Sequence, residues 1–254
     1  MNSSGVEPET FEIDVAVISD SGTERGHNED HCGKYIKNKT CGLVAVADGQ
    51  ATFEGGSLAS QRAILALMRS FRELAPGMSQ VQRLVRAARN ANYEVYDMAV
   101  VVPQLRGMST TLTAVAVAEG QLTAAHAGNS RVYLIRDGFI NQLSKDHTVG
   151  AEAAAGLGQV LPRGRDVLTR TLGRELLVPF DLFEIDLVQG DVVIVCTDGL
   201  YRVFEDAEMA ELVRGLDAAA ACRKLIDSAN AIGTVDNLTA AVVCVTGETP
   251  GTRR

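Results

Sequence analysis

The hydrophobic positions of the chain alternate with polar ones in some segments and form short continuous runs in others, and both patterns predict strands. Residues 11–18 (FEIDVAVI) alternate at first and then become apolar, as expected for a strand. Residues 42–47 (GLVAVA) are short, apolar and β-branched, which is typical of a strand buried on both faces. Further strands are predicted at 110–118, 121–127, 131–135, 183–187, 192–197 and 238–245, with Glu119-Gly120 and Asp137-Gly138 as hairpin turns.

Four other segments carry their apolar residues at helical spacing. The first presents an apolar face between Leu58 and Phe71 and is expected to end at Pro76-Gly77. The second runs from Val81 to Met98, with Ser79 as its expected N-cap. Two more are predicted at 206–215 and 217–230, the latter capped by Asp217, and the glycine-rich stretch 146–165 predicts a mobile loop with one short helix.

Strands and helix pairs follow one another in blocks, and no repeat or proline-rich linker interrupts them. Block order argues against a doubly wound parallel sheet and favours an α+β fold, a four-layer α-β-β-α sandwich of two antiparallel sheets flanked by helix pairs. We expect one domain over residues 11–247, with flexible ends at 1–10 and 248–254.

The composition excludes several classes of protein. A net charge of −8 disfavours non-specific nucleic-acid binding, which needs excess Lys and Arg. The sequence contains no run of about 18 apolar residues, so no membrane span is predicted. The segment MNSSGVEPET lacks the features of a secretory signal. The five cysteines are odd in number and form no C-x-x-C, so we expect reduced thiols in a cytoplasmic protein.

Two places repeat one local design, a buried strand that ends in Asp-Gly. They are Asp48-Gly49, after residues 43–47, and Asp198-Gly199, after residues 192–197. A single Asp-Gly is most often a turn. A buried strand, however, delivers its last side chain to a fixed position, and the glycine lets a ligand approach the backbone closely.

Two further polar segments stand near predicted strands. RGHNED at 25–30 precedes one strand, and TVDNLT at 234–239 opens the last. Each alone is typical of a cap or a surface turn. His27 and His31 are four residues apart, but a loop that continues into a strand places them too far apart to share an ion. We expect a local hydrogen bond for His126 and a turn-fixing role for His147.

Eight motifs in order resemble the metal-dependent protein phosphatase family (type 2C, PPM) in its bacterial form. They are SDSGTERGHNED at 19–30, VADG at 46–49, GMSTTLTA at 107–114, HAGNSRVYLIRDG at 126–138, LSKDHT at 143–148, VLTRTLG at 167–173, CTDGL at 196–200 and TVDNLTA at 234–240. The resemblance covers about residues 12–245. It implies hydrolysis of phosphoserine and phosphothreonine on proteins by a water that bridges two Mg²⁺ or Mn²⁺ ions.

The resemblance also implies residue roles. Asp48 is expected to bridge the two ions, with the Gly49 carbonyl on one of them, and Asp198 and Asp236 to complete one ion's ligands. Asp30 is expected to serve the other ion, directly or through water, with Glu29 beside it. Arg25 is expected to bind the substrate phosphate, its alternative being a surface ion pair with Glu24 or Glu29. Asn237 is expected to orient Asp236 from behind.

This chemistry suits oxygen ligands. Two ions about 3.5–4 Å apart can acidify a water and neutralise the phosphoryl oxygens, and carboxylates without Cys or His favour Mg²⁺ or Mn²⁺ over zinc. Two carboxylates ~5 Å apart repel by roughly 3 kcal/mol at an effective dielectric of 20. We therefore expect the metal-free protein to be less stable at neutral pH.

The sequence departs from the family pattern at two places. Residues 50–53 (QATF) carry no histidine where animal members keep a proposed general acid, so water is expected to protonate the leaving group. Asn129 replaces an aspartate linked to a third, weaker ion, which predicts weak or absent binding of that ion.

Two alternative functions remain open from the sequence. One is a catalytically weak binding or sensor module, and the other is a phosphatase for small metabolites. By resemblance, the expected partner is a phosphoprotein such as a Ser/Thr kinase or its targets, with no nucleic acid or membrane, and the chain is expected to be a monomer.

Overall fold

The computed structural model describes residues 11–50, 55–74, 77–157 and 166–247, and the elements below belong to these ranges. The strands are β1 (Phe11–Asp20), β2 (Asp30–Asn38), β3 (Cys41–Gln50), β4 (Ser109–Thr110), β5 (Leu112–Ala118), β6 (Gln121–Ala127), β7 (Arg131–Arg136), β8 (Phe139–Gln142), β9 (Asp181–Asp186), β10 (Val192–Cys196) and β11 (Leu238–Gly247). The helices are α1 (Gly55–Glu73), α2 (Gln80–Val101), α3 (Val149–Leu157), α4 (Asp198–Tyr201), α5 (Asp206–Val213) and α6 (Ala218–Ile232), with a 3₁₀ turn at Pro103–Leu105. The flexible ends predicted at 1–10 and 248–254 lie outside the described residues.

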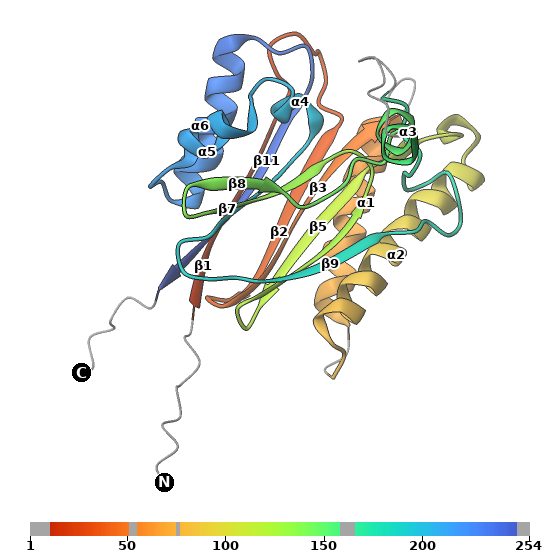
Figure 1. Ribbon diagram of the computed structural model, residues 1–254. Helices are drawn as coiled ribbons and strands as arrows, with labels where there is room; N and C mark the ends of the chain where they lie inside the picture. The colour runs from red at the N-terminus through yellow and green to blue at the C-terminus, as the bar shows by residue number, and fades with distance from the viewer. Residues whose placement is uncertain (1–10, 51–54, 75–76, 158–165, 248–254) are drawn as a thin grey trace.

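The strands form two antiparallel sheets that pack face to face. One has the order β1-β11-β10-β7-β8, and the other has the order β2-β3-β5-β6-β9 with β4 added to β3. Helices α1 and α2 cover the outer face of the second sheet, and α5 and α6 cover that of the first (Figure 1). The predicted four-layer α+β sandwich is confirmed.

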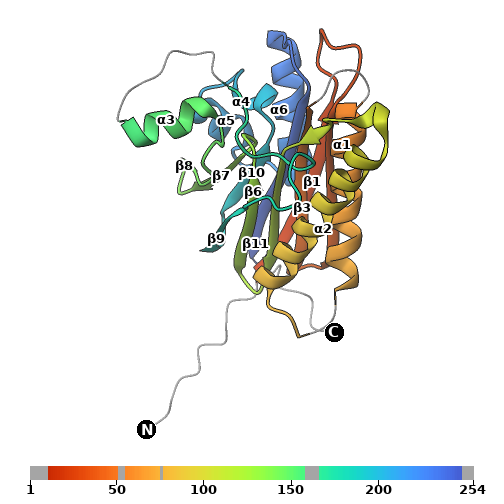
Figure 2. The same cartoon turned by 90° about the vertical axis from the view of Figure 1, so that its right-hand side faces the viewer.

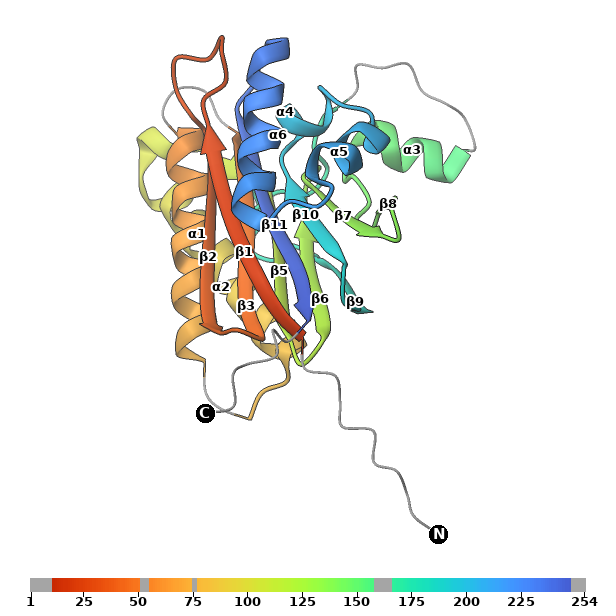
Figure 3. The same cartoon turned by 90° about the vertical axis from the view of Figure 1, so that its left-hand side faces the viewer.

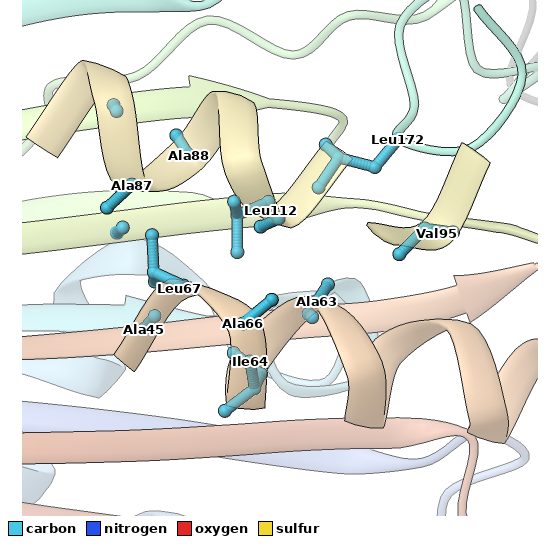
Figure 4. Packing of buried hydrophobic residues seen from close by; sticks show 14 of the residues in the cluster. Ala45, Ala63, Ile64, Ala66, Leu67, Ala87, Ala88, Val95, Leu112 and Leu172 are labelled. Atoms are coloured by element: carbon cyan, nitrogen blue, oxygen red, sulfur yellow. The ribbon is translucent and has the colours of Figure 1, made fainter. Parts of the chain in front are cut away.

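Three hydrophobic clusters correspond to the three interfaces between these layers. One lies between α1, α2 and the β3–β5–β6 sheet, one lies between the sheets, and one lies between β10, β11 and helices α4–α6. In the first, Leu67 of α1 packs among Ala45, Leu112 and the alanines Ala87 and Ala88 of α2 (Figure 4). Small side chains at these contacts let the helices lie close to the sheet.

The local signals in the sequence are confirmed where the structure describes them. Ser79 caps α2 in a capping box with Gln82, and the Asp217 side chain accepts from Ala220 N at the start of α6. Both predicted hairpin pairs adopt positive φ, with values of 53° at Glu119 and at Asp137, as a two-residue turn between twisted strands requires. The predicted short helix within 146–165 is α3.

Two features of the strands differ from the prediction. The strand predicted at 110–118 is divided into β4 and β5 at Thr111. Thr110, the last residue of β4, and Thr111 both bond to the backbone of Asp48, and these bonds interrupt the strand. The strand β8, which completes the hairpin after Asp137-Gly138, was not among the predicted strands; its residues are mostly exposed and carry little apolar signal.

One end of the sandwich gathers segments that are distant in sequence. The β1–β2 loop, α4 and the end of α6 lie there together (Figures 2 and 3), whereas Phe11 and Gly247 pair at the opposite end. Among the described helices, none is sufficiently long and apolar to span a bilayer. All five cysteines are free, as predicted.

Candidate metal centre

A cleft of about 370 Å³ opens at this end of the sandwich. The described residues that line it are Arg25, Glu29, Asp48, Gly49, Gln50, Asn129, Asp166, Leu168, Asp198, Arg202, Asp236 and Asn237. The structure therefore brings together the predicted acids at 48, 198 and 236, although they come from three separate segments and from both sheets.

Asp48 is held at the cleft by its own backbone. Its N–H donates to Thr111 Oγ1 at 2.9 Å, and its carbonyl accepts from Thr111 N and from Thr110 Oγ1, both at 2.9 Å. These bonds fix the end of β3 against the start of β5, so the carboxylate leaves a rigid strand. Gln50 Nε2 donates to Asp48 Oδ1 at 3.1 Å.

The two Asp-Gly glycines serve close packing of protein segments. A Cβ on Gly49 would lie 2.1 Å from Gly56 O, and a Cβ on Gly199 would lie 2.0 Å from Asn237 O. The absence of a side chain at these glycines makes room for neighbouring backbone, and the predicted approach of a ligand to them stays a prediction. The contact at Gly199 joins the start of α4 to the segment that carries Asp236.

Arg25 lies at the rim beside Asp236. Its Nη2 is 2.9 Å from Asp236 Oδ1, and its Nε donates to the Val235 carbonyl at 2.9 Å. The alternative ion pairs with Glu24 or Glu29 are not formed among the described residues. The side chain is 49% exposed, so part of the guanidinium can meet a ligand that enters the cleft.

Asp30 does not line the cleft but lies buried behind it. It pairs with Asp48 across the β2–β3 ladder, and its Oδ2 accepts from Thr197 Oγ1 at 2.7 Å and from Thr239 Oγ1 at 2.8 Å. Thr239 lies in β11 of the opposite sheet, and Thr197 directly follows β10 of that sheet. Burial raises the pKa of Asp30 to about 7, against the two hydroxyl donors that lower it.

Asn237 contacts Asp236 through its backbone, while its side chain holds the β1–β2 loop. Its Oδ1 accepts from Glu29 N, and its Nδ2 donates to the carbonyls of Ser21 and His27, each at 2.9 Å. The side chain thus clamps the β1–β2 loop that carries Arg25 and Glu29. The bond to Asp236 Oδ1 comes from the backbone N–H of Asn237, at 3.0 Å.

Asn129 contacts the predicted metal ligand Asp198. Its Nδ2 donates to Asp198 Oδ2 at 3.1 Å, and its carbonyl accepts from Tyr201 Oη at 3.1 Å. The side-chain oxygen Oδ1 is buried without a hydrogen-bond partner among the described residues. An amide therefore stabilises Asp198 at a position where an aspartate would repel it.

Three of the four histidines make hydrogen bonds that support the fold. His31 Nδ1 lies 3.0 Å from Ser60 Oγ of α1, and His126 bonds to Thr113 and to the Lys145 carbonyl. His147 exchanges two hydrogen bonds with Gly128, through its backbone N–H and its Nδ1. It thus fixes the turn before Asn129, as predicted.

Burial, with a smaller contribution from mutual repulsion, raises the pKa values of several acids of the cleft. Burial, followed by the charges of Asp30, Asp198 and Asp236, raises the pKa of Asp48 well above its usual value. Burial also raises the pKa of Asp198, against the lowering effect of Arg202, and burial raises that of Glu29. A site in which three carboxyl groups resist ionisation gains free energy from a bound cation.

The donor set fits a hard divalent cation. Carboxylates of Asp48, Asp198 and Asp236 and the carbonyl of Gly49 border one polar cleft, and oxygen ligands of this kind suit Mg²⁺ and Mn²⁺. In the described ranges, no three His, Cys, Asp or Glu side chains already converge as a cage. Each carboxylate has a protein partner instead, and at Asp198 the partners among the described residues occupy one oxygen, Oδ2.

Four lining residues were not predicted from the sequence, and two of them, Asp166 and Arg202, are charged. Arg202 bonds to Asp198 Oδ2 at 3.0 Å and to Asp166 Oδ2 at 2.6 Å. The spacing of Asp198 and Arg202, four residues apart after a strand end, was a signal for this pair. Asp166 carried no such signal, because it meets Arg202 from a separate segment.

Comparisons with known proteins find related sequences and structures. A family model described as protein phosphatase 2C matches residues 23–231. The serine/threonine phosphatase stp of Listeria innocua is 30% identical over 236 residues, which cover 89% of this chain and 93% of that protein.

Solved structures show the same fold. The crystal structure of the Mycobacterium tuberculosis serine/threonine phosphatase PstP/Ppp superposes with a TM-score of 0.82 at 31% identity, covering 92% of this chain and 99% of that one. A structure of the catalytic domain of PstP in complex with two manganese ions has a TM-score of 0.82 at 32% identity, covering 93% and 100%.

Proposed function

The chain belongs to the protein phosphatase 2C family of metal-dependent serine/threonine protein phosphatases, and we propose that its acidic cleft is the metal centre of this reaction. The observation that carries the proposal is the convergence of Asp48, Asp198 and Asp236 on one cleft that also contains Arg25. The manganese-bound PstP catalytic domain, at 32% identity, supports two Mn²⁺ or Mg²⁺ ions as cofactors.

We propose that Asp48 contacts both ions, that the Gly49 carbonyl contacts one of them, and that Asp198 and Asp236 complete the ligands of one ion. When bound, the ions supply positive charge for the phosphoryl oxygens and acidify water. Asp30 serves the other ion from behind Asp48, directly or through a water. Thr197 and Thr239 occupy its Oδ2. Glu29 stands at the wall of the same cleft.

Arg25 is the proposed phosphate-binding residue. Its side chain is half exposed, and its Nε donates to the Val235 carbonyl, which holds the side chain in place. Once a cation takes up the Asp236 carboxylate, the Nη groups of Arg25 can donate in a fork to two phosphate oxygens. Asn237 supports this geometry by clamping the loop on which Arg25 lies.

The proposed substrate is phosphoserine or phosphothreonine on a protein, such as a Ser/Thr kinase or one of its targets. The serine/threonine phosphatase relatives support this class. We propose a cytoplasmic protein, since five free cysteines suit a reducing compartment. We also propose that the chain is a monomer. Asn129 in contact with Asp198 supports weak binding of any third ion, because a neutral amide is a poorer ligand for a hard cation than a carboxylate.

Hydrolysis assays separate this function from a binding or sensor role. The purified chain is given a phosphoserine peptide and p-nitrophenyl phosphate with Mn²⁺ or with EDTA. The proposal predicts Mn²⁺-dependent release of phosphate from both, lost in a D48N variant. Release that is equal in EDTA, or absent in Mn²⁺, contradicts it, and release from p-nitrophenyl phosphate without release from the peptide favours a phosphatase for small molecules.

A further inference from the structure

Arg202 is the second arginine of the cleft, and no assigned role uses it. Among the described residues that line the cleft, it shares a positive charge with Arg25 alone. The side chain is 47% exposed, and its Nη2 lies between the carboxylates of Asp166 and Asp198. It follows α4 directly, and its backbone N–H donates to the carbonyls of Asp198 and Leu200.

The contact with Asp198 leaves room for a cation. Arg202 Nη2 and Asn129 Nδ2 both contact Oδ2 of Asp198, at 3.0 and 3.1 Å. Its other oxygen, Oδ1, accepts no hydrogen bond from the described residues. Asp198 can therefore turn one oxygen to a cation while the other keeps Arg202 beside the site.

The charge of the cleft shows why a second arginine matters. Glu29, Asp48, Asp166, Asp198 and Asp236 carry five negative charges against two from arginine, which leaves a net charge of minus three when all are ionised. Two divalent cations bring the cleft to plus one. Without Arg202 this count falls to zero, so the residue supplies half of the positive side-chain charge that a phosphate dianion meets at the lining of the cleft.

The second partner of Arg202 can be displaced. Asp166 is 54% exposed and comes from a separate segment. Exposed ion pairs contribute about 0–1 kcal/mol, so an anion brought by a bound substrate can replace this carboxylate at little cost. The present pair shows that the guanidinium accommodates anionic oxygens at the rim.

We propose that Arg202 is a substrate-binding residue that exchanges Asp166 for an anionic group of the phosphorylated substrate. That group is either the phosphate itself or a carboxylate next to the phosphorylated residue. The inference rests on the proposed function, because it takes the cleft as the site at which the substrate binds.

The test compares four variants with the wild-type chain at saturating Mn²⁺. R202M removes the charge, R202K keeps the charge without the planar fork, and D166N removes the competing carboxylate. R214M is the matched control, because Arg214 forms an exposed pair with Glu211 away from the cleft. Calorimetry measures binding of inorganic phosphate and of two phosphoserine peptides, one with Glu and one with Gln beside the phosphoserine, and hydrolysis is measured on both peptides.

We expect R202M to weaken binding by about tenfold, the scale of one charge-assisted hydrogen bond. If Arg202 contacts the phosphate, inorganic phosphate and both peptides are affected; if it contacts a flanking carboxylate, the Glu peptide alone is affected. R202K should recover part of the loss, D166N should strengthen binding by about twofold, and R214M should match the wild type.

Two results would overturn the inference. One is an R202M variant that needs more Mn²⁺ but binds phosphate and peptides normally once saturated, because Arg202 would then act through Asp198 alone. The other is unchanged binding throughout, or a wild-type chain that binds none of these ligands. A wild type that binds but hydrolyses nothing contradicts the proposed function, and the binding constants still decide the role of Arg202.

Discussion

Asp30 and Asp48 face each other across the β2–β3 ladder, yet they occupy different environments. Asp48 borders the cleft, whereas Asp30 is 3% exposed and bonded to two threonines. The sequence motifs predicted both as acids of one site. The sequence pattern could not predict the burial of Asp30, because its partners Thr197 and Thr239 come from the end of β10 and from β11, which are distant in sequence.

Asn129 is the residue at which this site departs most from its family pattern. In N129D, a carboxylate would replace the amide that donates to Asp198 Oδ2, so metal-free repulsion rises and a further cation ligand appears. We expect a higher maximal rate of hydrolysis at high Mn²⁺, with a second rise in the Mn²⁺ activation curve. Rates on p-nitrophenyl phosphate against Mn²⁺ concentration measure this, and a curve that superposes on the wild type would refute the role given to Asn129.

Among the elements of the fold, the ends of three strands position the acids of the site. β3 ends at Asp48-Gly49-Gln50, β10 leads into Asp198, and Asp236 stands directly before β11. The apolar runs predicted these strands, because burial on both faces leaves a continuous signal. The break at Thr111 could not be predicted, since it follows from bonds between threonine side chains and the Asp48 backbone, which are 62 and 63 residues apart in sequence.

Gly199 joins two of these elements and provides a test of their contact. In G199A, the new Cβ would lie 2.0 Å from the Asn237 carbonyl, so α4 and the Asp236 segment must separate. We expect a loss of about 1–3 kcal/mol in the free energy of unfolding, as for other overpacked sites, together with weaker Mn²⁺ binding.

Urea denaturation of G199A in EDTA measures the first effect, and a Mn²⁺ titration measures the second. G26A is the control, because a Cβ on Gly26 meets nothing within 4 Å. Wild-type stability in G199A would show that the close approach of these segments is not required.

At the scale of the whole molecule, the cleft lies at the seam of the two sheets. Asp48 comes from the β2–β3–β5–β6–β9 sheet, and Asp198 and Asp236 adjoin strands of the other. The layered class was predictable because strands and helix pairs occur in blocks. The distances between carboxylates were not, because they depend on how the valines of the two inner faces pack, including Val44, Val195 and Val243.

Stability of the metal-free molecule should fall as the pH rises. Burial raises the pKa of Asp30 from 3.8 to about 7 and raises the pKa values of Asp48 and Asp198. Between the unfolded-state and the folded-state pKa values of these acids, the folded state therefore binds more protons than the unfolded state. The free energy of unfolding decreases as the pH rises through this window.

We expect the chain in EDTA to be more stable at about pH 5 than at about pH 8, by on the order of 2–4 kcal/mol. D30N should remove much of this difference. Urea denaturation at both pH values measures it, and stability that is equal or greater at the higher pH would show that the acids do not resist ionisation.

The central claim is that Asp48, Asp198 and Asp236 together bind two hard cations. A calorimetric titration of Mn²⁺ into the metal-free chain tests it most directly, with the D48N/D198N/D236N triple variant beside the wild type. We expect two Mn²⁺ per wild-type chain, as in the PstP catalytic domain, and no binding by the variant over the same concentrations. A triple variant that takes up Mn²⁺ with unchanged stoichiometry and affinity would contradict it.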